Sequence, residues 1–203
     1  NAFLISLYVF FLFLEQRVMG LKMSALFPKE HHYNLASNII NQIIMDTQTY
    51  VGIKSAMSFI TAFCSWLIMK SVGLDFAEFW ALLIFFLNFI PNIGSMIATA
   101  FPAMLALVQY QSSLMPFCVI TFGIITVQFV VGNLIEPKFL GDQLNLSPFV
   151  VLISLGIWGA LWGVLGLFLA VPIMVILMIV FSRFEKTKPI AILLSQNGAV
   201  RAC

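Results

Sequence analysis

Charged side chains are scarce in this chain. Asp, Glu, Lys and Arg together make up 9% of the 203 residues, whereas a soluble domain carries about 25%. Hydrophobic residues make up 62%, and the mean hydropathy is +1.05. This composition excludes a water-soluble domain. It predicts an all-α polytopic integral membrane protein, because a helix pairs its own backbone groups in lipid.

Metal ligands, nucleophile motifs and clusters of basic residues are also lacking. The net charge is only +2 and the basic residues are scattered, so nucleic acid is not an expected partner. Cys64, Cys118 and Cys203 lack metal or disulfide spacing, and His31 and His32 form an adjacent pair more typical of a surface than of a metal site. No zinc-protease, phosphate-loop or serine-elbow motif occurs. We therefore expect no metal, no cofactor and no enzymatic activity.

Composition divides the chain into four segments. Residues 1–14 are apolar but shorter than the roughly 20 residues a span needs, so we interpret them as the end of a transmembrane helix in the C-terminal part of a longer chain. Residues 15–52 read as a loop containing an amphipathic helix, 53–182 as a transmembrane core and 183–203 as a tail. The loop and the tail each carry three basic residues near the membrane, which predicts that both are cytoplasmic.

The predicted core contains four apolar stretches, at 53–68, 79–108, 117–135 and 149–181. Lys54 and Lys70 are placed to snorkel at the ends of the first stretch. If both flanking segments face the cytoplasm, the number of crossings is even. The sequence leaves two counts open: four, if the second and fourth stretches each cross once as kinked or partly re-entrant elements, or six, if each crosses twice.

The second stretch is interrupted by the sequence LNFIPNIGSM. Pro91 removes a backbone donor and Gly94 frees the chain to turn, so we predict a discontinuous helix whose ends are available to a solute or ion. The amides of Asn88 and Asn92, and the hydroxyl of Ser95, favour this interpretation because lipid offers them no partners. The alternative is a kink in a packed helix.

A second polar interruption, NLIEPKFLGDQLNLSP, follows the third stretch. Glu136 comes after an apolar run that already contains Gln128 and Asn133, and the cost of burying a charge in lipid predicts that it lies at an interface or in a cavity. We expect Pro137 to end the helix and Gly141 to shape the connection that follows. Glu136 is either part of an ordinary interfacial loop or a gate or proton-linked carboxylate at a pore mouth.

Glycines break up the fourth stretch. Gly156, Gly159, Gly163 and Gly166, followed by Pro172, predict interruptions in this apolar run. Small residues four apart also suit close helix packing, and we favour packing over a direct role in transport for these glycines.

Three blocks of the sequence resemble the signature blocks of the autoinducer-2 exporter (AI-2E) family, bacterial permease-like membrane proteins. They are NFIPNIGSMIATAFPAML at 88–105, GNLIEPKFLGDQLNLSPFVVLISL at 132–155 and WGVLGLFLAVPI at 162–173. The positions that match the family's motifs are Pro91, Asn92, Gly94, Asn133, Glu136, Pro137, Gly141, Gly166 and Pro172. The resemblance implies a homo-oligomeric inner-membrane transporter that exports autoinducer-2, or a sodium/proton antiporter as described for some relatives.

The hypothesis that combines these readings is an exporter of a small polar solute, with the lipid bilayer and that solute as partners. The candidates for lining its pathway are Asn88, Pro91, Asn92, Gly94, Ser95, Gln128, Asn133 and Glu136. No acidic residue lies well inside a predicted span, which favours a solute over a cation. A membrane scaffold that transports nothing is the third possibility.

Overall fold

The computed structural model describes residues 30–140 and 145–198, together with positions 7, 10, 11, 14, 15, 18 and 22. Most of the predicted helix end at 1–14, and Gly141, therefore lie outside the described residues. Internal contacts divide the chain into two units, 1–45 and 46–203. Apart from the first part of the helix that begins at Glu30, the architecture below belongs to the second unit.

Helices make up this architecture, and the described residues contain no strand beyond one isolated bridge between Leu146 and Ser195. In chain order the elements are α2 (Glu30–Val72), α3 (Ala77–Leu87), α4 (Ile93–Gln109), α5 (Met115–Phe129), the π-helix η1 (Val130–Ile135), α6 (Glu136–Leu140), α7 (Pro148–Trp162), α8 (Val164–Ser182) and α9 (Lys188–Leu194). The predicted all-α membrane fold is confirmed. Within the described residues, three helical runs are long and apolar enough to cross a membrane: Ala36–Val72, Met115–Leu140 and Val164–Ser182.

Two of these runs lie side by side in opposite directions. Near one end, Gly123 of α5 faces Ile68 of α2, and near the other, Glu136 of α6 bonds to Lys54 of α2. The predicted spans at 53–68 and 117–135 lie within these two runs. The helix expected within 15–52 and the span after it form one continuous helix, α2.

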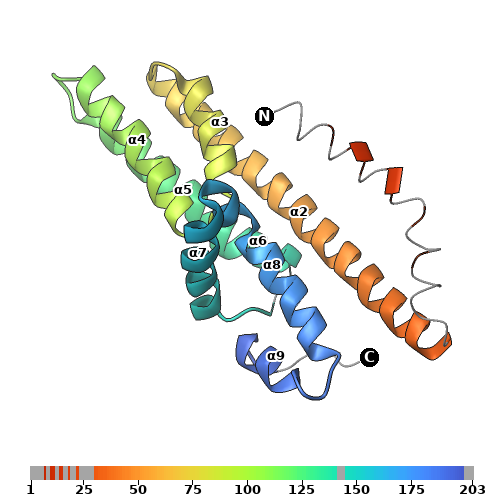
Figure 1. The fold of residues 1–203 in the computed structure, drawn as a ribbon. Coiled ribbons are helices and arrows are strands. Elements are labelled where there is room, and N and C mark those ends of the chain that lie inside the picture. Colours follow the sequence, from red (N-terminus) through yellow and green to blue (C-terminus); the bar gives the residue numbers. More distant parts are fainter. Residues whose placement is uncertain are drawn as a thin grey trace. The chain divides into compact units, whose positions relative to one another are not determined.

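The other two apolar stretches fold into helical hairpins (Figure 1). In α3–α4, Trp80 stacks on Phe101 at 6.0 Å between ring centroids, whereas Leu87 meets Gly94 at the tip, so the two helices are antiparallel. In α7–α8, Gly159 faces Leu167 across the tip. Each hairpin therefore pairs its first helix with its second and turns the chain back on itself.

Each hairpin returns to the end of the unit at which it starts, and the two hairpins start at opposite ends. The Tyr110 hydroxyl, just after α4, donates to the carbonyl of Val72 at 2.8 Å, which places the base of α3–α4 at the end of α2. The base of α7–α8 lies at the α6 end, where the Ser147 amide donates to Leu194 of α9 at 2.9 Å. Both stretches therefore return to the end of the unit from which they start, an arrangement that favours a double or re-entrant passage of each stretch over a single crossing.

The breaks at the two tips have local causes. Pro91 lacks an amide, and Asn92 adopts a φ of 60°, in the left-handed region. Gly163 has φ 62° and ψ −137°, a conformation essentially restricted to glycine. The interruptions predicted at the other positions are wrong: Gly156 and Gly159 lie inside α7, and Gly166 and the buried Pro172 lie inside α8. Neighbouring helices can pair the backbone groups that a proline frees inside a membrane bundle.

Pro137 does not end its helix either, contrary to the prediction. The helix continues through it to Leu140, because the π-helical turn at Val130–Ile135 widens the backbone just before the proline. The Glu136 amide reaches back five residues to the Val131 carbonyl. A wider turn gives the proline ring room where a regular α-helix would bring the carbonyl of the preceding turn against it.

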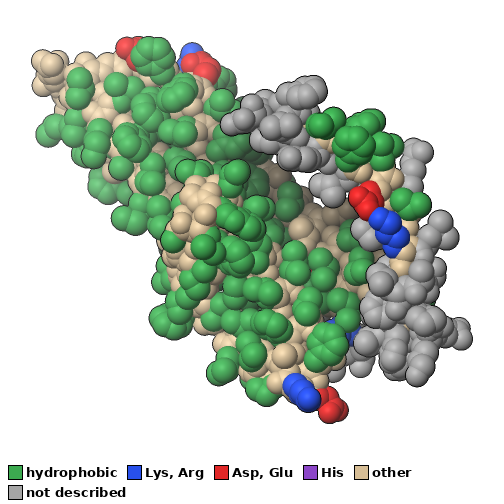
Figure 2. All heavy atoms as spheres, viewed as in Figure 1, with side chains coloured by type: hydrophobic (Ala, Val, Ile, Leu, Met, Phe, Trp, Pro, Cys, Tyr) green, Lys and Arg blue, Asp and Glu red, His purple; other side chains and the backbone are tan. Residues whose placement is uncertain are grey.

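The two tips pack against each other, and the outer surface is apolar. Phe89 stacks on Phe168 at 5.5 Å, and Ile90 is buried with Leu155 and Ala170. Apolar side chains cover the visible face of the second unit, and acidic and basic side chains gather at its ends (Figure 2). Phe59, Phe122 and Leu165 are each more than 60% exposed, as expected of side chains that face lipid.

Candidate functional site

A cavity of about 610 Å³ opens where the tip of α3–α4 faces α2, the α5–α6 run and the start of α7. Every predicted pathway residue except Gly94 lines it: Asn88, Pro91, Asn92, Ser95, Gln128, Asn133 and Glu136. Residues from two segments far apart in the sequence, 88–95 and 128–136, thus share one cavity wall. Tyr50, Lys54, Leu146, Pro148, Val151 and Val171 are among the other lining residues.

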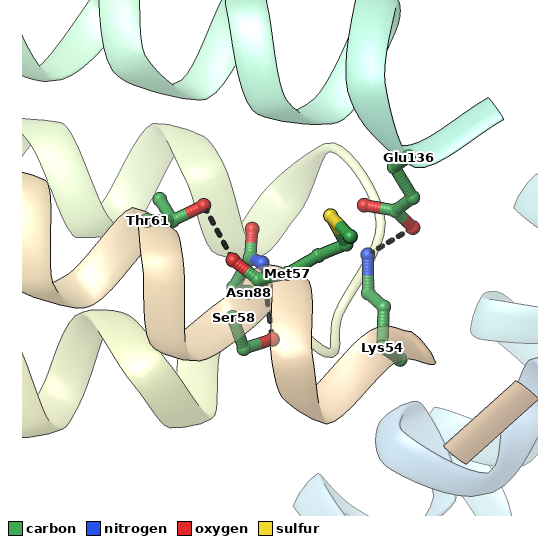
Figure 3. Close-up of polar contacts among 6 residues, drawn as sticks. All are labelled: Lys54, Met57, Ser58, Thr61, Asn88 and Glu136. Atoms are coloured by element: carbon green, nitrogen blue, oxygen red, sulfur yellow. Dashed lines mark hydrogen bonds and ion pairs between the residues drawn. The ribbon is translucent and has the colours of Figure 1, made fainter. Parts of the chain in front are cut away.

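The hairpin tip supplies amide and hydroxyl groups in a defined geometry. The Asn88 side-chain amide donates to the Ser58 hydroxyl of α2 at 3.0 Å, which fixes the tip against that helix (Figure 3). Ser58 lies about 21 Å along α2 from Val72 at 1.5 Å per residue. With Val72 taken as one edge of a hydrocarbon layer about 30 Å thick, the tip lies within that layer.

Gly94 is not among the residues that line the cavity; it lies where α3 and α4 approach each other at the hairpin tip. A Cβ atom at this position would lie 1.8 Å from the Leu87 carbonyl oxygen, so only glycine lets α3 and α4 approach this closely. Gly166 has the same relation to the Trp158 carbonyl, again at 1.8 Å, in the second hairpin. Pro172 is buried beside Val171, which lines the cavity, whereas Pro137 is exposed.

The charged part of the cavity is an ion pair between two helices. The Lys54 ammonium of α2 lies 2.7 Å from a carboxylate oxygen of Glu136 on α6, and the two side chains are 9% and 13% exposed (Figure 3). The prediction that Lys54 snorkels at a helix end is wrong, since its side chain turns inward to Glu136. The opposite end of α2 carries the exposed pair Lys70–Glu78, at 2.5 Å.

Sequence reasoning missed Lys54 as a cavity residue, although a signal was present. Lys54, Ser58, Thr61 and Ser65 recur at intervals of three and four residues, which puts them on one face of a helix. All four are buried, and the Thr61 hydroxyl donates back to the Met57 carbonyl at 2.9 Å (Figure 3). A polar face within an apolar span indicates contact with protein rather than lipid.

The chain is similar to a family of known proteins and to several of its relatives. The chain matches the family described as AI-2E family transporter over residues 1–186. It is 35% identical to a putative transport protein of Haemophilus influenzae over 195 residues, which cover 96% of this chain and 56% of that protein. It is 34% identical to the AI-2 transport protein TqsA of Escherichia coli, with 96% and 55% covered. The chain spans about half the length of these relatives.

Proposed function

The chain belongs to the AI-2E transporter family, and from this membership we propose that the protein carries a small polar solute across a bacterial membrane, with the cavity as its binding site. The observation that carries the proposal is the meeting of a broken-helix tip with two antiparallel helical runs around a cavity whose wall contains amide, hydroxyl and charged side chains. Discontinuous helices at the midplane are how many transporters hold polar solutes. The matched proteins are named as transport proteins, not enzymes.

The lining side chains suit an oxygen-rich solute. Asn92, Gln128 and Asn133 each offer both a donor and an acceptor. Their NH2 groups can donate to carbonyl and hydroxyl oxygens of a solute, and their carbonyl oxygens can accept from its hydroxyl groups. Autoinducer-2, the molecule after which the relative TqsA is called an AI-2 transport protein, is a solute of this type. We propose export from the cell across the inner membrane, with residues 15–52 and 183–203 on the cytoplasmic side, by a homo-oligomer that cross-linking in membranes would test.

A sodium/proton antiporter is the second candidate. Glu136 supports it more than the sequence indicated, because this carboxylate lies within the apolar run Met115–Leu140 and lines the cavity. Against it, the carboxylate is already engaged by Lys54, so a bare cation would have to compete with an ammonium. The third candidate is a scaffold that transports nothing. It does not explain why polar side chains line a cavity of about 610 Å³.

The test is autoinducer-2 release from proteoliposomes that hold the full-length protein, with and without an imposed pH gradient. The expected result is release above that of empty liposomes, lost on Asn133→Ala. Absence of release by folded protein would reject this solute, and cation-driven pH change in the same liposomes would then support the antiporter. Unchanged release in Glu136→Gln would remove the carboxylate from the mechanism.

A further inference from the structure

The Lys54–Glu136 pair sets the charge balance of the cavity. Among the described residues that line it, Lys54 and Glu136 are the charged groups and Tyr50 is the other titratable one. The lining residues of α3–α4, α7 and α8 are uncharged. The described part of the cavity wall therefore holds one positive and one negative charge, bonded to each other at 2.7 Å and largely shielded from water.

Electrostatics restricts how a ligand can use this pair. Removing one partner of a buried ion pair leaves the other charge uncompensated, which is strongly unfavourable in a medium of low dielectric constant. A ligand that binds the Lys54 ammonium through its own negative charge would leave the Glu136 carboxylate as the uncompensated buried charge. Uptake of one proton by the carboxylate removes the penalty, because the group then becomes neutral.

The surrounding backbone favours an anion over a cation. Pro148 at the start of α7 and Ser95 near the start of α4 line the cavity, and no side chain caps the N-terminus of either helix. The amides of Ile93 and Gly94 in α4 already donate to the carbonyls of Pro91 and Ile90, so the positive end of the helix dipole is less compensated at α7 than at α4. The last carbonyls of α3, which would favour a cation, accept bonds from the amides of Asn88, Phe89 and Ile90. The start of α7 therefore adds to the positive charge that Lys54 brings to the cavity.

We propose that Lys54 binds the carboxylate of a small hydroxylated organic acid, and that Glu136 takes up a proton as its bond to Lys54 breaks. The proposal rests on the proposed transport function and adds the charge of the solute and its coupling. One anion and one proton enter the site from the same side. On release, the proton leaves the Glu136 oxygen and the ion pair reforms, so the cycle moves no net charge.

The test compares erythronate with erythritol, two four-carbon solutes that differ in a carboxylate against a hydroxymethyl group. The full-length protein is reconstituted in liposomes with a pH indicator in the lumen. Erythronate entry is expected to acidify the lumen by about one proton per anion and to be insensitive to membrane potential, whereas erythritol entry carries no proton. Lys54→Gln is expected to lower erythronate entry about ten- to hundredfold, the loss of a charge-assisted hydrogen bond.

Further variants separate binding from coupling. In Glu136→Gln, erythronate still enters but without a proton, and its entry becomes sensitive to membrane potential. The double variant Lys54→Gln/Glu136→Gln keeps the cavity neutral, so the protein is expected to remain folded. It is expected to transport neither erythronate nor the accompanying proton. Lys70→Gln, which removes an exposed lysine at the opposite end of α2, is the matched control and is expected to change neither.

The remaining outcomes overturn the inference. Entry of erythritol with exclusion of erythronate, entry of erythronate without protons, or unchanged entry in Lys54→Gln would each reject it and leave the transport proposal intact. Entry of neither solute also rejects it. Autoinducer-2 release measured in the same liposomes then shows whether the transport proposal falls as well.

Discussion

At the scale of single residues, Asn92 combines a strained backbone with a place in the cavity wall. Its φ of 60° lies where residues other than glycine are rarely found, and such strain often marks a functional position. Asn92→Gly removes the amide and relieves the strain, so we expect stability to be maintained or raised by about 0.5–1 kcal/mol while autoinducer-2 release falls. Thermal unfolding and proteoliposome release measure the two effects separately. Full release in Asn92→Gly would mean that the backbone, not the amide, is what matters.

The ion pair is the second residue-scale feature that can be tested by stability alone. Lys54 and Glu136 are mostly buried and bonded at 2.7 Å, so Lys54→Gln and Glu136→Gln should each destabilise the protein by about 3 kcal/mol, through the uncompensated charge. The double variant should recover most of that loss. The apparent unfolding temperatures in detergent of the four proteins form a double-mutant cycle. Additive losses would show that the two side chains do not interact in the folded protein.

At the scale of elements, both hairpins depend on a glycine near the tip. A Cβ at Gly94 or Gly166 would lie 1.8 Å from a backbone carbonyl oxygen, whereas one at Gly156 in α7 meets nothing within 4 Å. Gly94→Ala and Gly166→Ala should therefore force the paired helices apart and lower the unfolding temperature sharply. Gly156→Ala is the matched control and should be neutral or stabilising by up to about 1 kcal/mol, because alanine favours helix. Tolerance of alanine at position 94 would contradict the close approach of α3 and α4.

The elements also show which features the sequence could reveal. The break at 88–92 was predictable because proline and adjacent amides conflict with a helix in lipid. The candidates at 88–95 and 128–136 line one cavity, as expected of polar side chains that avoid lipid. The helix breaks predicted at Pro137 and Pro172 are absent, because a π-helical turn precedes Pro137 and neighbouring helices surround the buried Pro172. The inward turn of Lys54 could not be read from its place near a predicted helix end, because it depends on Glu136, which lies far away in the sequence.

At the scale of the whole molecule, the two returning hairpins make a topological prediction. Ser71 and Ser112 flank α3–α4 and are exposed, and Lys186 follows α8 at the other end. In a cysteine-free background, Ser71→Cys and Ser112→Cys should react with a membrane-impermeant maleimide from one side of the membrane. Lys186→Cys should react only from the opposite side, the cytoplasmic one in our proposal, because α5–α6 crosses between them. If 79–108 crossed once, Ser71→Cys and Ser112→Cys would react from opposite sides, and the cavity at the hairpin tip would lose its structural basis.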